Sequence, residues 1–234
     1  MKRRYTVVLA VLLCVGLASC VQKPDIGQTL PPETVAASLP QTVPEVPAQT
    51  LPEPEDAVFV AVSDYLPEIL VDLKYATEDN FTGQVVYDFS TAYLRYGTVV
   101  KLAAVQEDLA QLGLGLKLWD GFRPVSAQFR LWEICPDTRF VANPETGFSS
   151  HSRGNTVDVT LVDSQGAEVE MPTAFDDFSA KADRDYSDCT AGAASNAQIL
   201  EILMEKHGFS GYRREWWHFT DTDEYPVEEQ FLSE

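Results

Sequence analysis

Three histidines occur in this chain of 234 residues, and two of them stand in patterns that suit metal chemistry. His151 precedes Asp158 in the stretch "SSHSRGNTVDVTL", and His218 ends the stretch "EWWH" that begins at Glu215. Imidazole and carboxylate groups are ordinary zinc ligands, and a catalytic zinc site combines three protein ligands with a water. We therefore expect one Zn²⁺ per chain, with His151 and Asp158 as two of its ligands.

His207 and His218 are the candidates for the third ligand. His207 precedes Gly208 at the end of a predicted helix, where a histidine commonly interacts with the last backbone carbonyls. His218 follows Glu215 by one helical turn of sequence, with two tryptophans between them. A carboxylate beside a catalytic zinc commonly removes a proton from water, and flanking tryptophans should exclude solvent and raise the pKa of Glu215. We favour His218 as the ligand and Glu215 as the general base.

The segment that carries Asp158 is predicted to be a strand with one polar face. Side chains alternate between the two faces of a strand, so residues 154–163 divide into a polar set and an apolar set. These are Thr156, Asp158 and Thr160 on one face and Val157, Val159 and Leu161 on the other. A carboxylate between threonines should face a polar cavity, and Gly154 would let the chain turn so that His151 approaches Asp158.

Arg123 is a further candidate for chemistry, because it follows a predicted strand in "LWDGFRP". An arginine beside the metal would stabilise the oxyanion that forms when a carbonyl is attacked. The alternative is that Arg123 simply pairs with Asp120 across the turn. The two interpretations are compatible, since Asp120 would then hold the guanidinium in place.

The remaining pattern predicts a mixture of strands and helices that do not alternate regularly, which favours an α+β fold. We expect strands over residues 69–76, 114–122 and 154–163, helices over 98–113, 126–135 and 194–209, and a terminal strand or turn over 212–220.

Five stretches together resemble the zinc D-alanyl-D-alanine dipeptidases, the family that includes the vancomycin-resistance dipeptidase. They are "DLKYATEDNFTG", "LKLWDGFRP", "SSHSRGNTVDVTL", "MPTAFDDF" and "GFSGYRREWWHF". The resemblance covers residues 58–220. The superfamily also contains D,D-carboxypeptidases and shares the pattern SxHxxGxAxD followed by ExxH, whereas "DLKYAT" and "EWWHF" favour the dipeptidase branch.

The resemblance implies a single compact domain with a central, mostly antiparallel sheet and flanking helices. The positions of the shared motifs also imply which residues bind zinc and which take part in catalysis. The ligands are His151, Asp158 and His218, the general base is Glu215, and the group that stabilises the transition state is Arg123.

The resemblance also implies two residues that bind substrate. Asp176, the first aspartate of "AFDDF", matches the acid that pairs with the free ammonium of the substrate, and Ser149 matches a serine that contacts the substrate. The chain departs from the family pattern at two positions. Thr156 replaces an alanine beside the ligand strand, and Pro172 stands where a glycine is expected before Asp176.

The expected activity is hydrolysis of D-Ala-D-Ala or related short D,D-peptides in cell-wall peptide turnover. Three alternatives remain open. The first is a D,D-carboxypeptidase that trims the terminal D-Ala from muropeptides. The second is a wall-peptide-binding lipoprotein that retains zinc without turnover. The third is a dipeptidase whose dipeptide is not D-Ala-D-Ala.

The N-terminal part of the sequence predicts an exported, lipid-anchored protein. Residues 1–19 combine a basic start, a short apolar run and "LAS", which is typical of a lipoprotein signal peptide, and Cys20 would carry the lipid. Residues 20–57 are rich in proline and lack aromatic residues, which predicts a disordered tether before a domain at 58–234. We expect attachment to the bacterial cell membrane through the lipid only, with the domain outside the cytoplasm.

The charge and the remaining cysteines limit the partners. The chain has 36 Asp and Glu against 17 Lys and Arg, a balance that repels phosphate backbones and argues against nucleic acid as a partner. The sequence implies no protein partner. Cys135 and Cys189 would meet an oxidising compartment, and a disulfide between them is a hypothesis whose alternative is two separate thiols.

Overall fold

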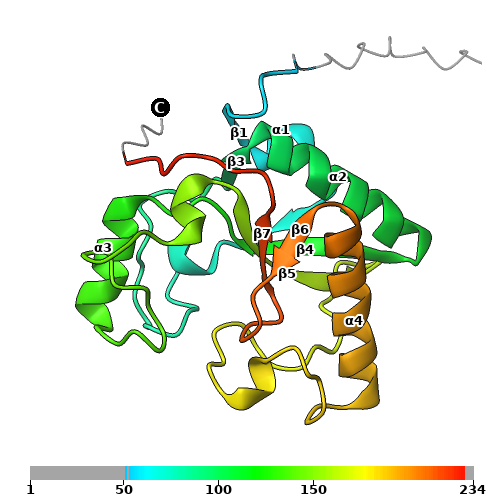
Figure 1. Cartoon of the computed structure of the whole chain (residues 1–234). Coiled ribbons are helices and arrows are strands. Elements are labelled where there is room, and N and C mark those ends of the chain that lie inside the picture. The colour runs from blue at the N-terminus through cyan, green and yellow to red at the C-terminus, as the bar shows by residue number, and fades with distance from the viewer. Residues whose placement is uncertain (1–50, 52, 230–234) are drawn as a thin grey trace, which may run out of the picture. The chain divides into compact units, whose positions relative to one another are not determined.

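The structure, a computed structural model, describes residue 51 and residues 53–229. The predicted signal peptide, Cys20 and most of the predicted tether therefore lie outside the described residues. The described part is built around a five-stranded sheet with the order β2-β4-β5-β7-β6 (Figure 1). Its strands are β2 (Leu70–Val71), β4 (Leu114–Asp120), β5 (Thr156–Asp163), β7 (His218–Asp221) and β6 (Phe209–Gly211).

The central sheet is mostly antiparallel, as expected for the predicted α+β class. Only the short pairing of β2 with β4 is parallel, and the other three pairings are antiparallel. A separate two-stranded sheet pairs β1 (Phe59–Ala61) with β3 (Tyr93–Arg95), also antiparallel. Strand β5 lies at the centre of the larger sheet, so it carries Asp158 into the middle of the domain.

Two long helices, α2 (Tyr96–Gln111) and α4 (Ala191–Lys206), pack beside the sheet, and α3 (Val125–Ile134) lies on the other side (Figure 1). The apolar face of β5 packs in the same core as α2 and α4, with Val157, Val159 and Leu161 almost fully buried. Full burial of one such aliphatic side chain contributes about 1.5–3 kcal/mol. The polar face of β5 is thereby turned away from these helices.

The helices begin and end where the sequence predicts, within a few residues. In α2 the apolar spacing from Val99 to Leu109 is buried, and Gly113 follows the helix with φ at 73°. The Thr190 hydroxyl accepts a hydrogen bond from the Ala193 amide at 3.1 Å and so caps the start of α4. Within residues 53–229, four short helices complete the fold: α1 (Val62–Tyr65), η1 (Lys74–Ala76), η2 (Ser150–Arg153) and η3 (Ala180–Ala182).

The strand predicted over residues 69–76 is wrong for most of its length. Only Leu70–Val71 pair with β4, and the chain then turns into η1. The turn buries Tyr75, whose carbonyl accepts hydrogen bonds from the amides of Val86 and Tyr87. Tertiary contacts of one buried tyrosine therefore override the local alternation.

Cys135 and Cys189 are both free thiols, which corrects the disulfide hypothesis. Cys135 ends α3, whereas Cys189 stands just before α4 and its sulfur contacts the Tyr186 carbonyl at 3.5 Å. The two helices lie on opposite sides of the molecule (Figure 1). A disulfide needs Cα atoms within about 7 Å, and this arrangement does not bring the two residues together.

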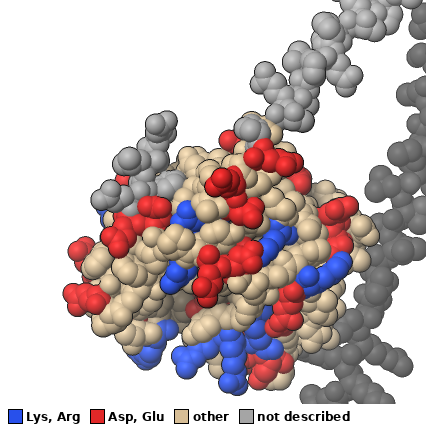
Figure 2. All heavy atoms as spheres, turned by 45° about the horizontal axis from the view of Figure 1, so that its top comes forward, with Lys and Arg blue, Asp and Glu red and all other residues tan. Residues whose placement is uncertain are grey.

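The surface of the described part is acidic but not uniformly so. In Figure 2, Asp and Glu side chains are spread over the face in view, and Lys and Arg side chains gather along its lower edge. Within residues 53–229, no helix has the length and apolarity needed to span a bilayer.

Candidate metal and substrate site

The pairing of three strands assembles the centre of the site. Asp158 on β5 stands opposite His218 on β7 and opposite Asp120 on β4. His151 belongs to η2, directly before β5. Gly154 ends η2 with φ at 76°, and a Cβ atom at this position would lie 2.2 Å from the Phe59 ring. The prediction that Gly154 turns the chain and lets His151 approach Asp158 is confirmed.

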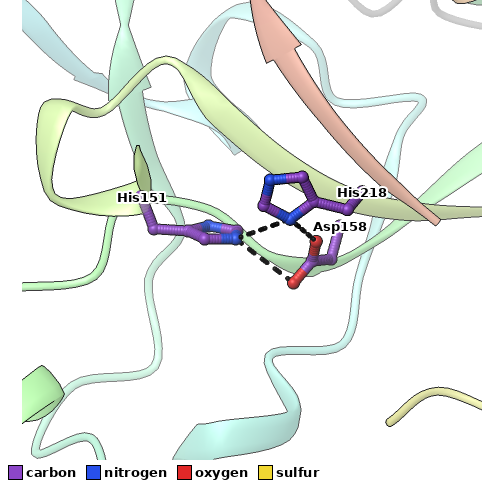
Figure 3. Close-up of side chains that lie close together, drawn as sticks. All are labelled: His151, Asp158 and His218. Carbon is purple, nitrogen blue, oxygen red and sulfur yellow. Dashed lines mark hydrogen bonds and ion pairs between the residues drawn. The ribbon is translucent and has the colours of Figure 1, made fainter. Parts of the chain in front are cut away.

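The three predicted metal ligands converge in space (Figure 3). One donor atom from each of His151, Asp158 and His218 lies within 4.8 Å of the other two. Nδ1 of His218 is 3.0 Å from one Asp158 carboxylate oxygen, and Nε2 of His151 is 3.4 Å from the other. The two ring nitrogens are 3.3 Å apart. Such a set of two imidazoles and one carboxylate matches the ligand chemistry of a divalent metal.

The contacts of His151 fix the orientation and the tautomer of its ring. Nδ1 of His151 is 2.8 Å from the Gly121 carbonyl, which can only accept a hydrogen bond. A neutral His151 therefore holds its proton on Nδ1 and turns the lone pair of Nε2 toward His218 and Asp158. Burial raises the pKa of Asp158, but its contacts with the two histidines outweigh burial and hold the pKa far below its usual range. The carboxylate is thus ionised, which is the form that can bind a metal ion.

Glu215 stands beside these ligands. Its carboxylate is 3.7 Å from Nδ1 of His218, and it lines the same cavity. Burial raises the pKa of Glu215, while the neighbouring His218 opposes the rise. The predicted increase in pKa is therefore present, and Trp217 contributes to the wall of the cavity next to Glu215. A carboxylate with a raised pKa is suited to accept and return a proton near neutral pH.

Arg123 pairs with Asp120 across the turn, which is the second of the two compatible interpretations of this arginine. Two of its nitrogens contact one Asp120 oxygen at 2.7 and 3.2 Å, and a third donates to Gln128 at 3.0 Å. Asp120 is wholly buried and also accepts hydrogen bonds from the Tyr87 hydroxyl and the Gly121 amide. Because a guanidinium has five N–H groups, N–H donors of Arg123 remain for the cavity that it lines.

Asp176 and Ser149 line the same cavity, which has a volume of about 300 Å³. The Tyr75 hydroxyl donates to Asp176 at 3.0 Å, and the Asp176 backbone has a positive φ of 57°, which non-glycine residues seldom adopt. Burial raises the pKa of Asp176 to about 8, and the charge of Asp158 adds to the rise. The Ser149 hydroxyl accepts a hydrogen bond from the His151 amide at 3.3 Å, so it also fixes the start of η2.

Two residues of the site were not singled out from the sequence. Tyr75 orients Asp176, and its ring also lies under the guanidinium of Arg123 at 4.9 Å. Arg184 donates to the carbonyls of Tyr212, Trp216 and His218 at 2.9–3.1 Å and so clamps the turn that carries Glu215. The stretch "DLKYAT" contains Tyr75, but no local pattern connects Arg184 to the distant turn.

His207 does not join the metal ligands. Its Nε2 atom is 2.6 Å from Asp108, which also pairs with Lys206 at the same distance. The cluster lies at the end of α4, where the sequence placed His207 as a helix-end residue. The choice of His218 over His207 as the third ligand agrees with this geometry.

A converging set of two histidines and one aspartate, with a glutamate and an arginine in the same cavity, is typical of metal-dependent hydrolases. The chain belongs to the D-ala-D-ala dipeptidase family, whose model matches residues 55–234. It is 36% identical to the D-alanyl-D-alanine dipeptidase of Escherichia coli over 162 residues, which are 69% of this chain and 83% of the relative. It is 35% identical to the D-alanyl-D-alanine dipeptidase of Enterococcus faecalis, over 72% of this chain and 94% of the relative.

Solved structures are also similar, at a lower level. One of them is a mutant of the vancomycin resistance D,D-pentapeptidase VanY in complex with Zn(II), and the match covers 58% of this chain and 76% of that chain. The sequence identity is 14% and the TM-score 0.37, so the family assignment depends on the sequence matches alone.

Proposed function

We propose that this protein is a zinc-dependent dipeptidase that hydrolyses D-Ala-D-Ala or a related short D,D-dipeptide. One observation carries the proposal: the ligand set of His151, Asp158 and His218 shares a cavity with Glu215 and Asp176. The cavity thus combines groups that can hold a metal, a group that can move a proton, and a carboxylate at the position where a substrate ammonium would bind.

The donor set fits one zinc ion per chain, with His151, Asp158 and His218 as its ligands. When bound, zinc would polarise the substrate carbonyl and lower the pKa of water in the cavity. Glu215 would take the proton from the attacking water and return it to the leaving amine. The free N–H groups of Arg123 would donate to the developing oxyanion, an interaction worth about 3–4 kcal/mol in comparable sites.

Asp176 distinguishes a dipeptidase from a carboxypeptidase. A carboxylate held by Tyr75 in a cavity of about 300 Å³ favours a substrate whose amino end is a free ammonium. An N-acylated peptide would bring an uncharged amide to Asp176, so the charge-assisted pair that a free ammonium forms there would be lost. The small volume also suits a dipeptide better than a muropeptide.

The test is an assay of the purified protein against free D-Ala-D-Ala and N-acetyl-D-Ala-D-Ala, with and without a chelator. We expect zinc-dependent hydrolysis of the free dipeptide and little hydrolysis of the blocked one. Preference for the blocked peptide would support the carboxypeptidase alternative. Zinc binding without hydrolysis of any D,D-peptide would support the non-catalytic alternative.

We also propose that the protein acts outside the cytoplasm, on dipeptides derived from the cell wall. The support is the sequence of residues 1–19 followed by Cys20, which resembles a lipoprotein signal. Two outcomes are expected: labelling of the protein with radioactive palmitate, and its recovery in the membrane fraction. The Cys20→Ala variant should lose both. Recovery of unlabelled wild-type protein in the cytoplasm would contradict this part of the proposal.

A further inference from the structure

A second cavity, here called the annex, lies next to the cavity that holds the metal ligands. It has a volume of about 460 Å³, and Asp176 lines both cavities. Strand β5 contributes to both as well, because Asp158 lines the first and Thr160 lines the annex. Residues two apart on a strand share a face, so the annex continues the polar face of β5 beyond the metal site.

The annex has apolar walls together with an excess of carboxylates. The apolar side chains that line it are Phe81, Trp119, Val169, Met171 and Phe175. The carboxylates that line it besides Asp176 are Glu78, Asp79, Glu168 and Asp177, against the single cation Lys74. A methylene chain would be buried against such walls, and an ammonium at its end would be attracted by both the carboxylates and the aromatic faces.

The ion pairs that exist around the annex leave part of its negative charge uncompensated. Lys74 pairs with Asp79 at 2.7 Å and with Asp72 at 3.0 Å, and Lys117 pairs with Glu168 at 3.0 Å. Among residues 53–229, no lysine or arginine forms an ion pair with Glu78 or Asp177. The electrostatic field in the annex therefore favours a cation over an anion.

Thr160 supplies an independent sign that the annex is built for a ligand. Its side chain is wholly buried, and its hydroxyl has no hydrogen-bond partner within the described part of the chain. Buried hydroxyl groups nearly always have a partner, and an unpartnered one calls for a specific explanation. Thr160 lines the annex, so a small shift of the wall would let a hydrogen-bond donor in the annex supply the missing partner of this hydroxyl.

We propose that the annex binds an alkylammonium side chain on the first residue of the dipeptide substrate. The inference rests on the proposed function, in which Asp176 pairs with the α-ammonium of that residue. Because Asp176 lines both cavities, this pairing would place the Cα atom of the first residue where the cavities adjoin, and its side chain would then extend past Phe175 into the annex. The enzyme would then select dipeptides whose first residue has a side chain that ends in a primary amine.

The experiment compares three dipeptides that differ only at the first residue: D-Ala-D-Ala, D-Lys-D-Ala and D-norleucyl-D-Ala. Norleucine has the same carbon chain as lysine without the amine. One charge-assisted contact in a buried site is worth about a tenfold preference or more, so kcat/KM for D-Lys-D-Ala should exceed that for D-norleucyl-D-Ala by about that factor. Equal values for these two substrates would overturn the proposal.

Two variants assign the preference to the annex. Thr160→Val and Asp177→Asn should each lower the ratio of kcat/KM for the lysyl and norleucyl substrates several-fold, while hydrolysis of D-Ala-D-Ala stays the same. Glu205→Gln, which removes an exposed charge on α4, is the matched control and should leave the ratio unchanged. A ratio that survives both annex variants would place the selectivity elsewhere and refute the assignment.

Stability measurements test whether Thr160→Val changes the kinetics only because it unfolds the protein. Thr160→Val should fold with an unchanged or higher Tm, because the hydroxyl that it removes has no partner in the fold. Thr98→Val is the control, since the buried Thr98 hydroxyl donates to Asp221 at 2.8 Å, and its loss should lower Tm by roughly 2–4 °C.

The outcome for D-Ala-D-Ala separates this inference from the proposed function. If none of the three dipeptides is hydrolysed, the proposed function fails, and the annex is then tested by calorimetry with D-Lys-D-Ala and D-norleucyl-D-Ala. Tighter binding of the lysyl peptide, weakened by Thr160→Val, would still support the annex. If D-Ala-D-Ala is hydrolysed and the lysyl peptide has no advantage, only the inference about the annex fails.

Discussion

Asp158 and His218 are cross-strand partners in the register of β5 and β7, so two of the three proposed metal ligands are placed by backbone pairing itself. Their side chains meet at 3.0 Å. The third ligand, His151, reaches the same point from the turn directly before β5, and the Gly121 carbonyl fixes its ring. A site carried on paired strands is held more rigidly than one carried on loops, which favours a preorganised metal centre.

Glu215→Ala and His218→Ala should separate catalysis from metal binding. Glu215 is not among the converging ligands, so Glu215→Ala should retain zinc and lose about 10²–10⁴-fold in kcat. His218→Ala removes a ligand and should lose both zinc and activity. Metal content by mass spectrometry and the rate of dipeptide hydrolysis are the measurements. A Glu215→Ala enzyme with the wild-type rate would end its assignment as the general base.

Arg123→Lys should lower kcat/KM by about 10²–10³-fold with zinc still bound. A lysine keeps the charge but cannot contact Asp120 and Gln128 together while presenting further donors to the cavity. Steady-state kinetics and metal analysis check this expectation. A change confined to KM would indicate that Arg123 binds the ground state of the substrate and does not act on the transition state.

Asp176→Asn should change how stability depends on pH in the chelator-treated protein. Burial raises the pKa of Asp176 to about 8, so the stability linked to its protonated form is complete below about pH 4 and is lost as the pH rises to about 8. Asn cannot ionise, so the variant should become more stable than wild type by about 1–3 kcal/mol at pH 8. This range is smaller than the full shift in pKa would give, because water that enters the cavity screens the charge of Asp176.

The measurement for Asp176→Asn is urea denaturation at pH 5 and pH 8, with Asp177→Asn as the neighbouring control. The same substitution should raise KM for the free dipeptide, because the partner of the substrate ammonium is gone. A stability difference between Asp176→Asn and wild type that does not grow with pH would contradict the raised pKa.

Gly154→Ala should destabilise the fold by about 2–4 kcal/mol, from the left-handed backbone and the contact with Phe59 together. Gly113→Ala is the matched control, since Gly113 also has a positive φ but nothing within 4 Å of an added Cβ. It should cost about 1 kcal/mol, the contribution of the backbone alone. Equal losses of stability in the two variants would show that the Phe59 ring moves aside without lowering the free energy of unfolding.

The chemistry of the site was readable from the sequence because it depends on residue types in short stretches. Alternation along 154–163 correctly put Asp158 on a polar face, and Glu215 with two tryptophans before His218 indicated a partly buried carboxylate with a raised pKa. The long helices and the strands β4 and β5 were predictable for the same reason, since their periodicities are local.

What the sequence alone could not decide was which distant groups meet. Hydrogen bonds from Arg184 to the turn that carries Glu215, and from Tyr75 to Asp176, join segments that no local pattern links. The same holds for the strand predicted over 69–76, where burial of one tyrosine outweighed alternation beyond Val71, and for the two cysteines that remain apart. The sequence by itself indicated the candidate metal ligands and the candidate proton-transferring group, because these are matters of residue type and spacing. Only the tertiary structure decided how they are oriented and which cavity adjoins them, because packing and strand register act between segments far apart in the chain.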